Sequence, residues 1–281
     1  MASVIVENLK YRYPLAQELA LKGISFKVKE GEFIGLIGAN AAGKSTLCQA
    51  LTGLVPRFYR GAYAGRVIVG GWEAASSDRS EMALKVGMVF QNPFTQLSGV
   101  KLTVYEEAAF GLENLGLPRS EMIRRIDWAL KLLGLYRYKD RNPLTLSGGQ
   151  MQRLAIAGTL ALKPEVLVLD EPTSQLDPAG AEEIFQAVHE LHREGVTVIM
   201  AEHKVEKLAR YAERILLLDR GELIDFATPS QIFSRNDLES YGVAAPVYTR
   251  ICRTLGAVDP ESGLVPVTFE QACRALEYHY E

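Results

Sequence analysis

The sequence has no long apolar run. Its longest apolar stretches, near residues 166–169 and 215–218, have the length of a strand, whereas a helix needs about 20 apolar residues to cross a bilayer. Residues 1–9 lack the apolar core of a secretory leader and predict a strand with alternating polar residues. We therefore expect a soluble chain that would reach a membrane only through a partner.

Cysteine and excess charge are also scarce. The three cysteines, Cys48, Cys252 and Cys273, have no metal-ligand spacing, and a sparse, odd set is typical of a reducing compartment. The 31 basic and 34 acidic residues give a net charge of −3, and the basic residues form no tail or arm. Because the positive field of a nucleic-acid-binding protein is missing, we expect no nucleic-acid partner.

The composition instead predicts a packed α/β protein. The chain has 281 residues, of which 48% are hydrophobic, enough for one large domain and a smaller appendage. Strand-like apolar runs recur at residues 4–6, 24–28, 33–37, 66–69, 86–90, 166–169, 196–200 and 215–218. Helical patterns separate the later runs, which favours a parallel sheet. The early runs lie close together, so we expect them to form an antiparallel layer.

Helical spacing dominates the middle and the end of the chain. Met122, Ile126, Leu130 and Leu133 recur at helical intervals before Gly134, which fits a helix stop. We expect a helical subdomain over about residues 93–160, inserted into one large domain over residues 1–240. A small element over residues 241–281 would follow, with Phe269, Ala272, Cys273 and Leu276 on one helix face.

Several helix starts are also readable. Asp177 followed by Pro178 predicts an N-cap with proline in the first turn. Thr228 with Gln231, and Thr268 with Gln271, have the spacing of a capping box.

The first chemical motif is a phosphate-binding loop. Its residues are Gly38, Ala39, Asn40, Ala41, Ala42, Gly43, Lys44, Ser45 and Thr46, which fit the pattern G-x-x-x-x-G-K-[ST] between a strand and a helix. Backbone amides in such a loop hold phosphates, the lysine reaches the β- and γ-phosphates, and the serine binds Mg²⁺. A positive φ at Ala41 would cost about 1–2 kcal/mol, so we expect a negative φ there.

Two carboxylates end the apolar run at residues 166–169. Asp170 is placed to bind Mg²⁺, and Glu171 to polarise an attacking water, a contribution typically worth about 10²–10⁴-fold in rate. Adjacent acids at a strand end are often only solvated. The phosphate-binding loop earlier in the chain favours the catalytic interpretation.

Two glycines follow a helix cap in Ser147-Gly148-Gly149-Gln150. Ser147 and Gln150 have capping-box spacing, which is sufficient for an ordinary helix start. Each glycine nevertheless costs about 1 kcal/mol inside a helix. They are explained if a group such as a γ-phosphate must approach the backbone closely at this N-terminus.

Together these motifs resemble the ATP-binding cassette (ABC) family over roughly residues 3–235. The phosphate loop, LSGGQ at 146–150 and VLVLDEPTSQLDP at 166–178 occur in the family's order. The resemblance implies two cassettes paired head to tail, with ATP between the phosphate loop of one and the LSGGQ signature of the other.

The resemblance also implies roles for further residues. Gln91 matches the family's Q-loop glutamine, which touches Mg²⁺ and senses a membrane partner. His203 matches the switch histidine at the γ-phosphate, residues 174–177 match the loop that couples the two sites, and Tyr13 matches the aromatic residue stacked on adenine. Ala41 and Gln175 stand where the family usually has glycine and alanine. No matched catalytic group is lost, so we expect ATP hydrolysis.

The sub-family features resemble ATPases of energy-coupling factor (ECF) and cobalt-type importers. They are Tyr11-Arg12-Tyr13-Pro14, residues 20–26, the Q-loop at 91–96 and the tail around 268–272, although Phe94 replaces a usual aspartate. This implies a second ATPase, a transmembrane coupling subunit, a small membrane substrate-binding subunit, and a location on the cytoplasmic face of the membrane. The cargo would be a vitamin or a transition-metal ion.

A coupling helix of the membrane subunit would bind between the Q-loop and the helical insertion. Phe94, Leu97 and Val100 are candidates for the floor of that groove, or else they pack the insertion onto the core.

Alternatives remain at this stage. A conventional importer with a separate binding protein, an exporter with separate membrane subunits, a soluble ABC ATPase not linked to transport, and an ATP-dependent switch would share these motifs. The cargo, and the choice between homodimer and heterodimer, stay open.

Overall fold

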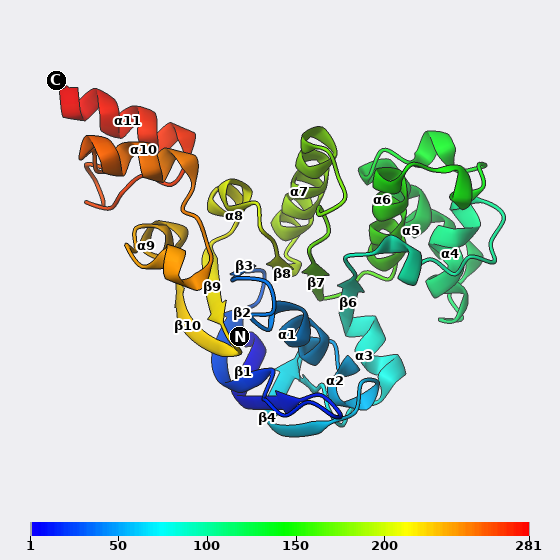
Figure 1. Cartoon of the computed structure of the whole chain (residues 1–281). Helices are drawn as coiled ribbons and strands as arrows, with labels where there is room; N and C mark the ends of the chain where they lie inside the picture. Colours follow the sequence, from blue (N-terminus) through cyan, green and yellow to red (C-terminus); the bar gives the residue numbers. More distant parts are fainter. Residues whose placement is uncertain (1, 281) are drawn as a thin grey trace.

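The computed structural model describes residues 2–280 and contains two sheets (Figure 1). The larger sheet has six strands in the order β10-β9-β3-β8-β7-β6. Its strands are β3 (Phe33–Ile37), β6 (Val86–Val89), β7 (Val166–Asp170), β8 (Thr197–Ala201), β9 (Arg214–Asp219) and β10 (Glu222–Ala227). All pairs are parallel except β9 with β10. Every residue of β3, β7 and β8 is buried, as expected for parallel strands covered on both faces.

The smaller sheet is antiparallel and has the order β2-β1-β4-β5. Its strands are β1 (Ala2–Arg12), β2 (Leu21–Lys29), β4 (Ala62–Val69) and β5 (Trp72–Glu73). Burial largely alternates along β2, because one face covers the core and the other meets solvent. The predicted α/β class, parallel core and antiparallel layer are therefore confirmed. Strands β5 and β10 were not predicted.

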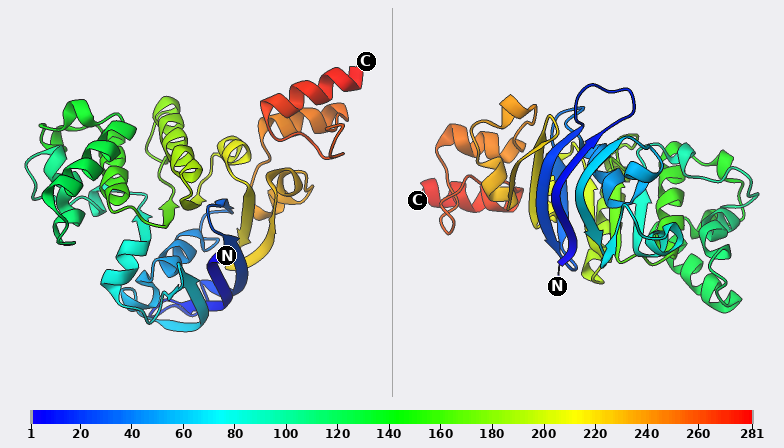
Figure 2. Two further views of the ribbon diagram at one scale, coloured as in Figure 1. Left: turned by 180° about the vertical axis from the view of Figure 1, so that it is seen from behind. Right: turned by 90° about the horizontal axis from the view of Figure 1, so that it is seen from below.

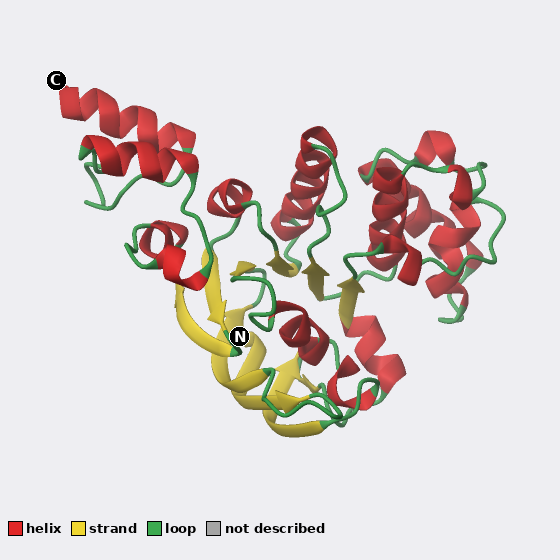
Figure 3. Cartoon of the chain, in the orientation of Figure 1, coloured by secondary structure: helices red, strands yellow, loops and turns green. Residues whose placement is uncertain are grey.

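Helices cover the parallel sheet on both faces (Figures 1, 2 and 3). Helix α1 (Lys44–Leu51) lies between the two sheets, where Leu47, Cys48 and Leu51 join a core with residues of both. The short α2 (Leu54–Arg57) and α3 (Arg79–Lys85) continue this side. The other face packs against α7 (Pro178–Arg193), α8 (Val205–Tyr211) and α9 (Pro229–Phe233). Asp177 and Thr228 cap α7 and α9 as the sequence predicted.

Three helices form a group at one end of the parallel sheet, which we call the helical lobe. They are α4 (Val104–Glu113), α5 (Arg119–Leu132) and α6 (Gly148–Ala161), with short 3₁₀ turns at Pro93–Thr95, Tyr136–Tyr138 and Pro143–Thr145. Ile126, Leu130 and Leu133 are buried, and Gly134 follows α5 with φ 64°. The helical spacing and its stop were read correctly from the sequence.

The chain ends in two helices that pack against each other. After a 3₁₀ turn at Leu238–Tyr241 come α10 (Val247–Leu255) and α11 (Phe269–Tyr280), whose contact buries Cys252, Ala257, Ala272 and Ala275. The predicted apolar face of α11 is thus partly right: Ala272 is buried, whereas Phe269 is exposed. Across the described residues, no helix is both long and apolar enough to span a bilayer.

The phosphate loop between β3 and α1 corrects one prediction. Ala41 has φ 63°, not the negative φ expected from its cost. The amide of Ala42 donates to the carbonyl of Ala39 at 3.1 Å, and the Ala42 carbonyl accepts from the amide of Gly221 at 2.9 Å. The two hydrogen bonds fix the four-residue turn at positions 39–42. A β-turn with a positive φ at its third residue, here Ala41, resembles type II. Tertiary contacts therefore override the local preference of alanine.

We predict that Ala41→Gly raises the free energy of unfolding by up to about 1.6 kcal/mol. The change removes about 1–2 kcal/mol of backbone strain from the folded state. It also increases the conformational entropy of the unfolded chain, which lowers stability by about 0.4–1 kcal/mol. Urea denaturation would measure it, with Ala42→Gly as the control at a buried neighbour outside the positive-φ region. Equal destabilisation by both changes would contradict the observed backbone conformation.

Candidate active site

Two glycines shape the phosphate loop because no other residue fits. A Cβ on Gly38 would lie 2.3 Å from the carbonyl oxygen of Leu218, and one on Gly43 would lie 2.9 Å from that of Ala20. Both residues also have positive φ, 152° and 104°. The loop therefore runs directly against β9 and the start of β2, and it delivers Lys44 to the first position of α1.

Lys44 is buried and turned back over its own loop. Its Nζ donates to the carbonyl oxygens of Gly38 at 3.0 Å and Ala39 at 3.2 Å, and it lies 3.5 Å from Oε1 of Glu171. A buried ammonium is costly without partners. These contacts hold the charge at the place where phosphates would enter the loop.

Ser45 and Asp170 meet across the gap between α1 and β7. Ser45 Oγ donates to Oδ1 of Asp170 at 3.0 Å. Burial raises the pKa of Asp170; the Ser45 hydrogen bond opposes this shift and the charge of Glu171 adds to it. A hydroxyl and a carboxylate side by side provide the oxygen donors that Mg²⁺ prefers.

The Glu171 carboxylate contacts polar side chains from two neighbouring segments. Oε2 accepts from Nε2 of Gln91 at 3.0 Å, and Oε1 lies 2.9 Å from Nε2 of His203. These three residues follow the carboxyl ends of β6, β7 and β8, which are adjacent in the sheet. The sequence predictions at Lys44, Ser45, Gln91, Asp170, Glu171 and His203 therefore fall on one cluster.

Glu171 has an unusual backbone for its residue type. Its φ is 49°, and its amide donates to the carbonyl of Ala201 at 2.9 Å. Strained residues of this kind cost about 1–3 kcal/mol and concentrate at functional sites. In this conformation the Glu171 carboxylate lies 3.5 Å from Lys44 Nζ at the end of the phosphate loop.

Glu202 supports this edge and was missed by sequence analysis. Its buried carboxylate accepts from the amide and hydroxyl of Thr173 and from the amide of His203. It therefore fixes the loop after Glu171 relative to His203. The sequence feature that could have identified Glu202 is its position directly after the apolar strand β8. Sequence analysis assigned a role only to the adjacent His203.

Tyr13 lies beside the phosphate loop. Its hydroxyl is 3.1 Å from Oγ1 of Thr46 and donates to Oε1 of Gln49 at 2.9 Å. Its ring meets that of Tyr11 edge-on at 4.8 Å. This places an aromatic ring next to α1, while stacking on adenine stays a prediction.

The signature residues form a capping box and remain separate from the phosphate loop. The Gln150 amide donates to Ser147 Oγ at 3.3 Å, and the Ser147 amide donates to Oε1 of Gln150 at 3.0 Å. Among residues 2–280, no hydrogen bond or ion pair joins positions 147–150 to positions 38–46. Gly148 is exposed, and a Cβ added there would meet no atom within 4 Å.

The side-chain amides of the buried Gln152 and the half-buried Gln96 connect the signature helix to the Q-loop, a link that the sequence did not reveal. Gln152 on α6 is 2% exposed and donates to the carbonyl of Phe90 at 3.1 Å. Gln96 accepts from the amide of Phe90 at 3.2 Å and donates to Thr159 Oγ1 at 2.7 Å. Phe90 directly precedes Gln91 in the chain. Its carbonyl is tied to α6 through Gln152, and its amide is tied to α6 through Gln96 and Thr159.

A groove of about 370 Å³ lies between the core and the helical lobe. Leu54, Phe58, Met82, Phe90, Gln96 and Leu162 are among the residues that line it. Of the three residues predicted for this floor, Phe94 and Val100 are exposed. Leu97 lines a neighbouring hollow of about 180 Å³. Whether these three side chains receive a coupling helix stays a prediction.

Comparisons with known proteins agree with this geometry. The family model for ABC transporters matches residues 21–174. A putative ABC transporter ATP-binding protein of Pyrococcus horikoshii is 45% identical over 253 residues, covering 89% of this chain and 88% of that protein. The energy-coupling factor transporter ATP-binding protein EcfA1 of Lacticaseibacillus paracasei is 45% identical over 249 residues, covering 88% of this chain and 87% of its own.

Solved structures give the same result. CbiO1 of Clostridium perfringens, part of the ABC transporter complex CbiONQ, has a TM-score of 0.74 and 33% identity, covering 91% of this chain and 96% of its own. A dimeric ATP-binding cassette in a post-hydrolysis state with ADP and phosphate has a TM-score of 0.70 and 31% identity, covering 80% of this chain and 98% of its own. The chain therefore belongs to the ABC transporter family, as an ATP-hydrolysing cassette that resembles the ATP-binding subunits of ECF and cobalt-type transporters.

Proposed function

We propose that the chain is the ATP-hydrolysing subunit of a membrane import complex and closes as a dimer on two ATP molecules. The observation that carries this proposal is the convergence of Lys44, Gln91 and His203 on the Glu171 carboxylate. An acid that three donors orient beside a phosphate loop is suited to accept a proton from an attacking water.

The phosphate loop and Lys44 would bind the ATP phosphates. Lys44 now donates to two carbonyl oxygens of its own loop, and these bonds would be exchanged for charge-assisted bonds to phosphate oxygens, which are stronger. Tyr13, half-buried beside Thr46, would contact adenine.

The donor set beside the loop fits Mg²⁺. Ser45 Oγ and Asp170 Oδ1 lie 3.0 Å apart, and Gln91, whose side chain lies at Glu171, would add an amide oxygen. Bound Mg²⁺ would neutralise charge on the phosphates.

Glu171 would act as the general base. Gln91 and His203 approach different oxygens of its carboxylate, so its direction is set before any water arrives. His203, whose side chain is half exposed, would then contact the γ-phosphate.

The exposed signature supports a site shared between two cassettes. Neither a positive φ nor packing within the described chain requires glycine at position 148, although glycine is unfavourable in a helix. A close approach by a group from outside the chain explains it. The N-terminus of α6 would thus meet the γ-phosphate held by a partner cassette.

We predict that Glu171→Gln lowers ATP turnover by about 10²–10⁴-fold, retains ATP binding and stabilises the closed dimer. The amide cannot accept the proton, while the remaining loop is unchanged. Turnover and nucleotide-dependent dimerisation would be measured by phosphate release and light scattering. Glu165→Gln, just before the same strand, is the control. Wild-type turnover in Glu171→Gln would reject Glu171 as the base.

We predict that Ser147→Arg abolishes turnover and ATP-dependent dimerisation but leaves ATP binding to the monomer within about twofold. The bulky cation would block the α6 N-terminus, which lies apart from this chain's own phosphate loop. Ser120→Arg, an exposed serine on the same lobe, is the matched control. Loss of monomer binding in Ser147→Arg would contradict a site shared between cassettes.

The import role rests on the relatives and on two surfaces. EcfA1 and CbiO1 are named as transporter components, so we propose a transmembrane coupling subunit in the groove beside Phe90 and Gln96. A small membrane subunit would bind a vitamin or transition-metal ion, and the complex would lie on the cytoplasmic face of the membrane. Exposed Val247, Ile251 and Leu255 on α10 would contact the second ATPase.

Purification of the tagged chain from native membranes in mild detergent tests the import role. We expect a coupling subunit, a small membrane protein and an ATPase pair that persists without nucleotide through the C-terminal helices. Two large permease subunits would instead indicate a conventional importer. ATPase activity confined to the soluble fraction, without a membrane partner, would reject a transport role.

A further inference from the structure

A second pocket lies between the helical lobe and the core, apart from the ATP site. Its volume is about 450 Å³, and Arg124, Arg125, Trp128, Lys163, Glu194 and Val196 are among its lining residues. The pocket is built from α5, the carboxyl ends of α6 and α7, and the segments that lead into β7 and β8. Glu171 follows the opposite end of β7, so this pocket is not part of the catalytic cluster.

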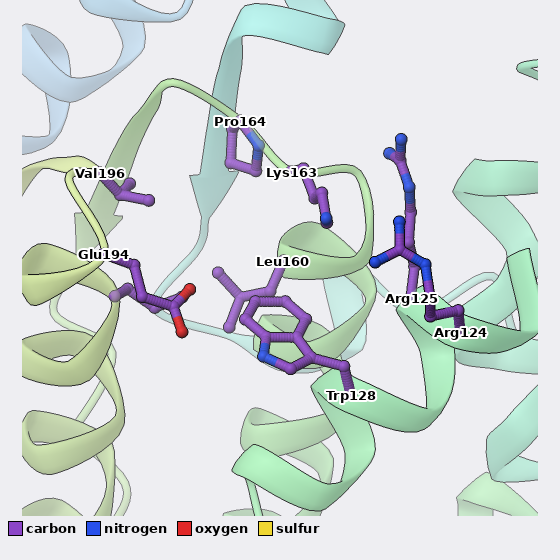
Figure 4. A pocket seen from close by; sticks show the side chains of 9 residues that line it. Arg124, Arg125, Trp128, Leu160, Lys163, Pro164, Glu194 and Val196 are labelled. Atoms are coloured by element: carbon purple, nitrogen blue, oxygen red, sulfur yellow. The ribbon is translucent and has the colours of Figure 1, made fainter. Parts of the chain in front are cut away.

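Three polar side chains at the pocket are without a protein partner in the part of the chain that the structure describes; Trp128 is half-buried, and Lys163 and Glu194 are exposed. Within residues 2–280, the side chains of Trp128, Lys163 and Glu194 make no hydrogen bond or ion pair. Figure 4 shows the Trp128 ring between Glu194 on one side and the two arginines on the other, with Lys163 across from it. The pocket therefore offers a flat apolar surface, a cation and a carboxylate at once.

The arginines have a different role from Lys163. Arg124 and Arg125 both donate to Glu121, and Arg125 also donates to the carbonyl of Leu162 at 3.3 Å. These bonds hold their guanidinium groups at the α5 wall. The uncommitted charges are those of Lys163 and Glu194.

The backbone of Lys163 is informative because it has φ 57° just after α6. Helices commonly place glycine at this position, since a side chain there is strained. A cation near a helix carboxyl end is favourable, which accounts for a positive charge at this position. It does not account for the half-buried Trp128 or for the position of the exposed Glu194 on the other side of that ring (Figure 4).

We propose that this pocket binds a small nucleotide whose base carries an amino group, of the adenosine monophosphate class. The base would stack on Trp128, and the phosphate would pair with Lys163 and the arginine wall. Glu194 would accept from the amino group of the base. A pocket of this volume is within the usual range for small-molecule sites.

The test is direct binding of adenosine monophosphate, followed through Trp128. The chain has two tryptophans, so Trp72→Phe leaves Trp128 as the only one. Lys44→Ala, added to the same full-length chain, weakens nucleotide binding at the phosphate loop and makes the measurement independent of the proposed catalysis. We expect saturable quenching of Trp128 fluorescence by adenosine monophosphate.

Matched variants decide which groups bind the ligand. Lys163→Gly removes the cation and suits the positive φ, so it should fold and weaken binding at least tenfold. Lys131→Gln, an exposed lysine nearby on α5, should leave affinity unchanged. Inosine monophosphate, which presents an oxygen where adenosine has the amino group, should bind at least tenfold more weakly. Glu194→Gln should reduce that discrimination.

Several results would overturn the proposal. They are the absence of saturable quenching at millimolar nucleotide, equal affinity in Lys163→Gly, or equal affinity for inosine monophosphate. Competition by inorganic phosphate at the same concentration as the nucleotide would also reject a role for the base. Thermal unfolding of each variant would verify that the fold is retained.

Discussion

The Glu171 carboxylate is the contact on which the arrangement of the site depends. It receives Gln91 from the segment after β6, His203 from the segment after β8, and the charge of Lys44 from the phosphate loop. None of these side chains is near another in sequence. They meet because parallel strands end at one edge of the sheet, and because β6, β7 and β8 are neighbours in it.

The same carboxylate is indirectly connected to the helical lobe. Gln152 and Gln96 hold the Q-loop against α6, and α6 begins at the signature residues. A shift of α6 relative to the core would therefore pull on Phe90 and change the position of Gln91 at Glu171. These hydrogen bonds form a contiguous physical connection between the lobe and the edge of the sheet that carries Glu171.

Sequence motifs predicted which residues meet beside the phosphate loop better than they predicted the packing around them. Lys44, Asp170 and Glu171 were identifiable because each stands at a fixed offset from a strand or a glycine turn. Gln152 was not, because a single glutamine in a helix looks the same whether it is solvated or bonded to a distant carbonyl. For Phe94 and Val100 the sequence left two roles open, because apolar loop residues carry no periodicity that fixes their direction; both side chains are exposed. The six-residue strand β10 was missed since its sequence, ELIDFA, lacks a continuous apolar run.

Some residues with a strained backbone show where tertiary contacts, and not local sequence preference, determine the conformation of the chain. Ala41 and Glu171 both have positive φ, and local preference predicts the opposite for each residue type. Each such residue costs about 1 kcal/mol or more, a large share of the roughly 5–15 kcal/mol that stabilises a typical protein. Lys163 and Glu171, both strained, flank the single strand β7. One lines the pocket between lobe and core, and the other faces the phosphate loop. The amide of Glu171 is held by the carbonyl of Ala201 at the end of β8, whereas the positive φ of Lys163 belongs to the carboxyl end of α6. The conformation of Glu171 therefore depends on a tertiary contact, and that of Lys163 on the end of its own helix.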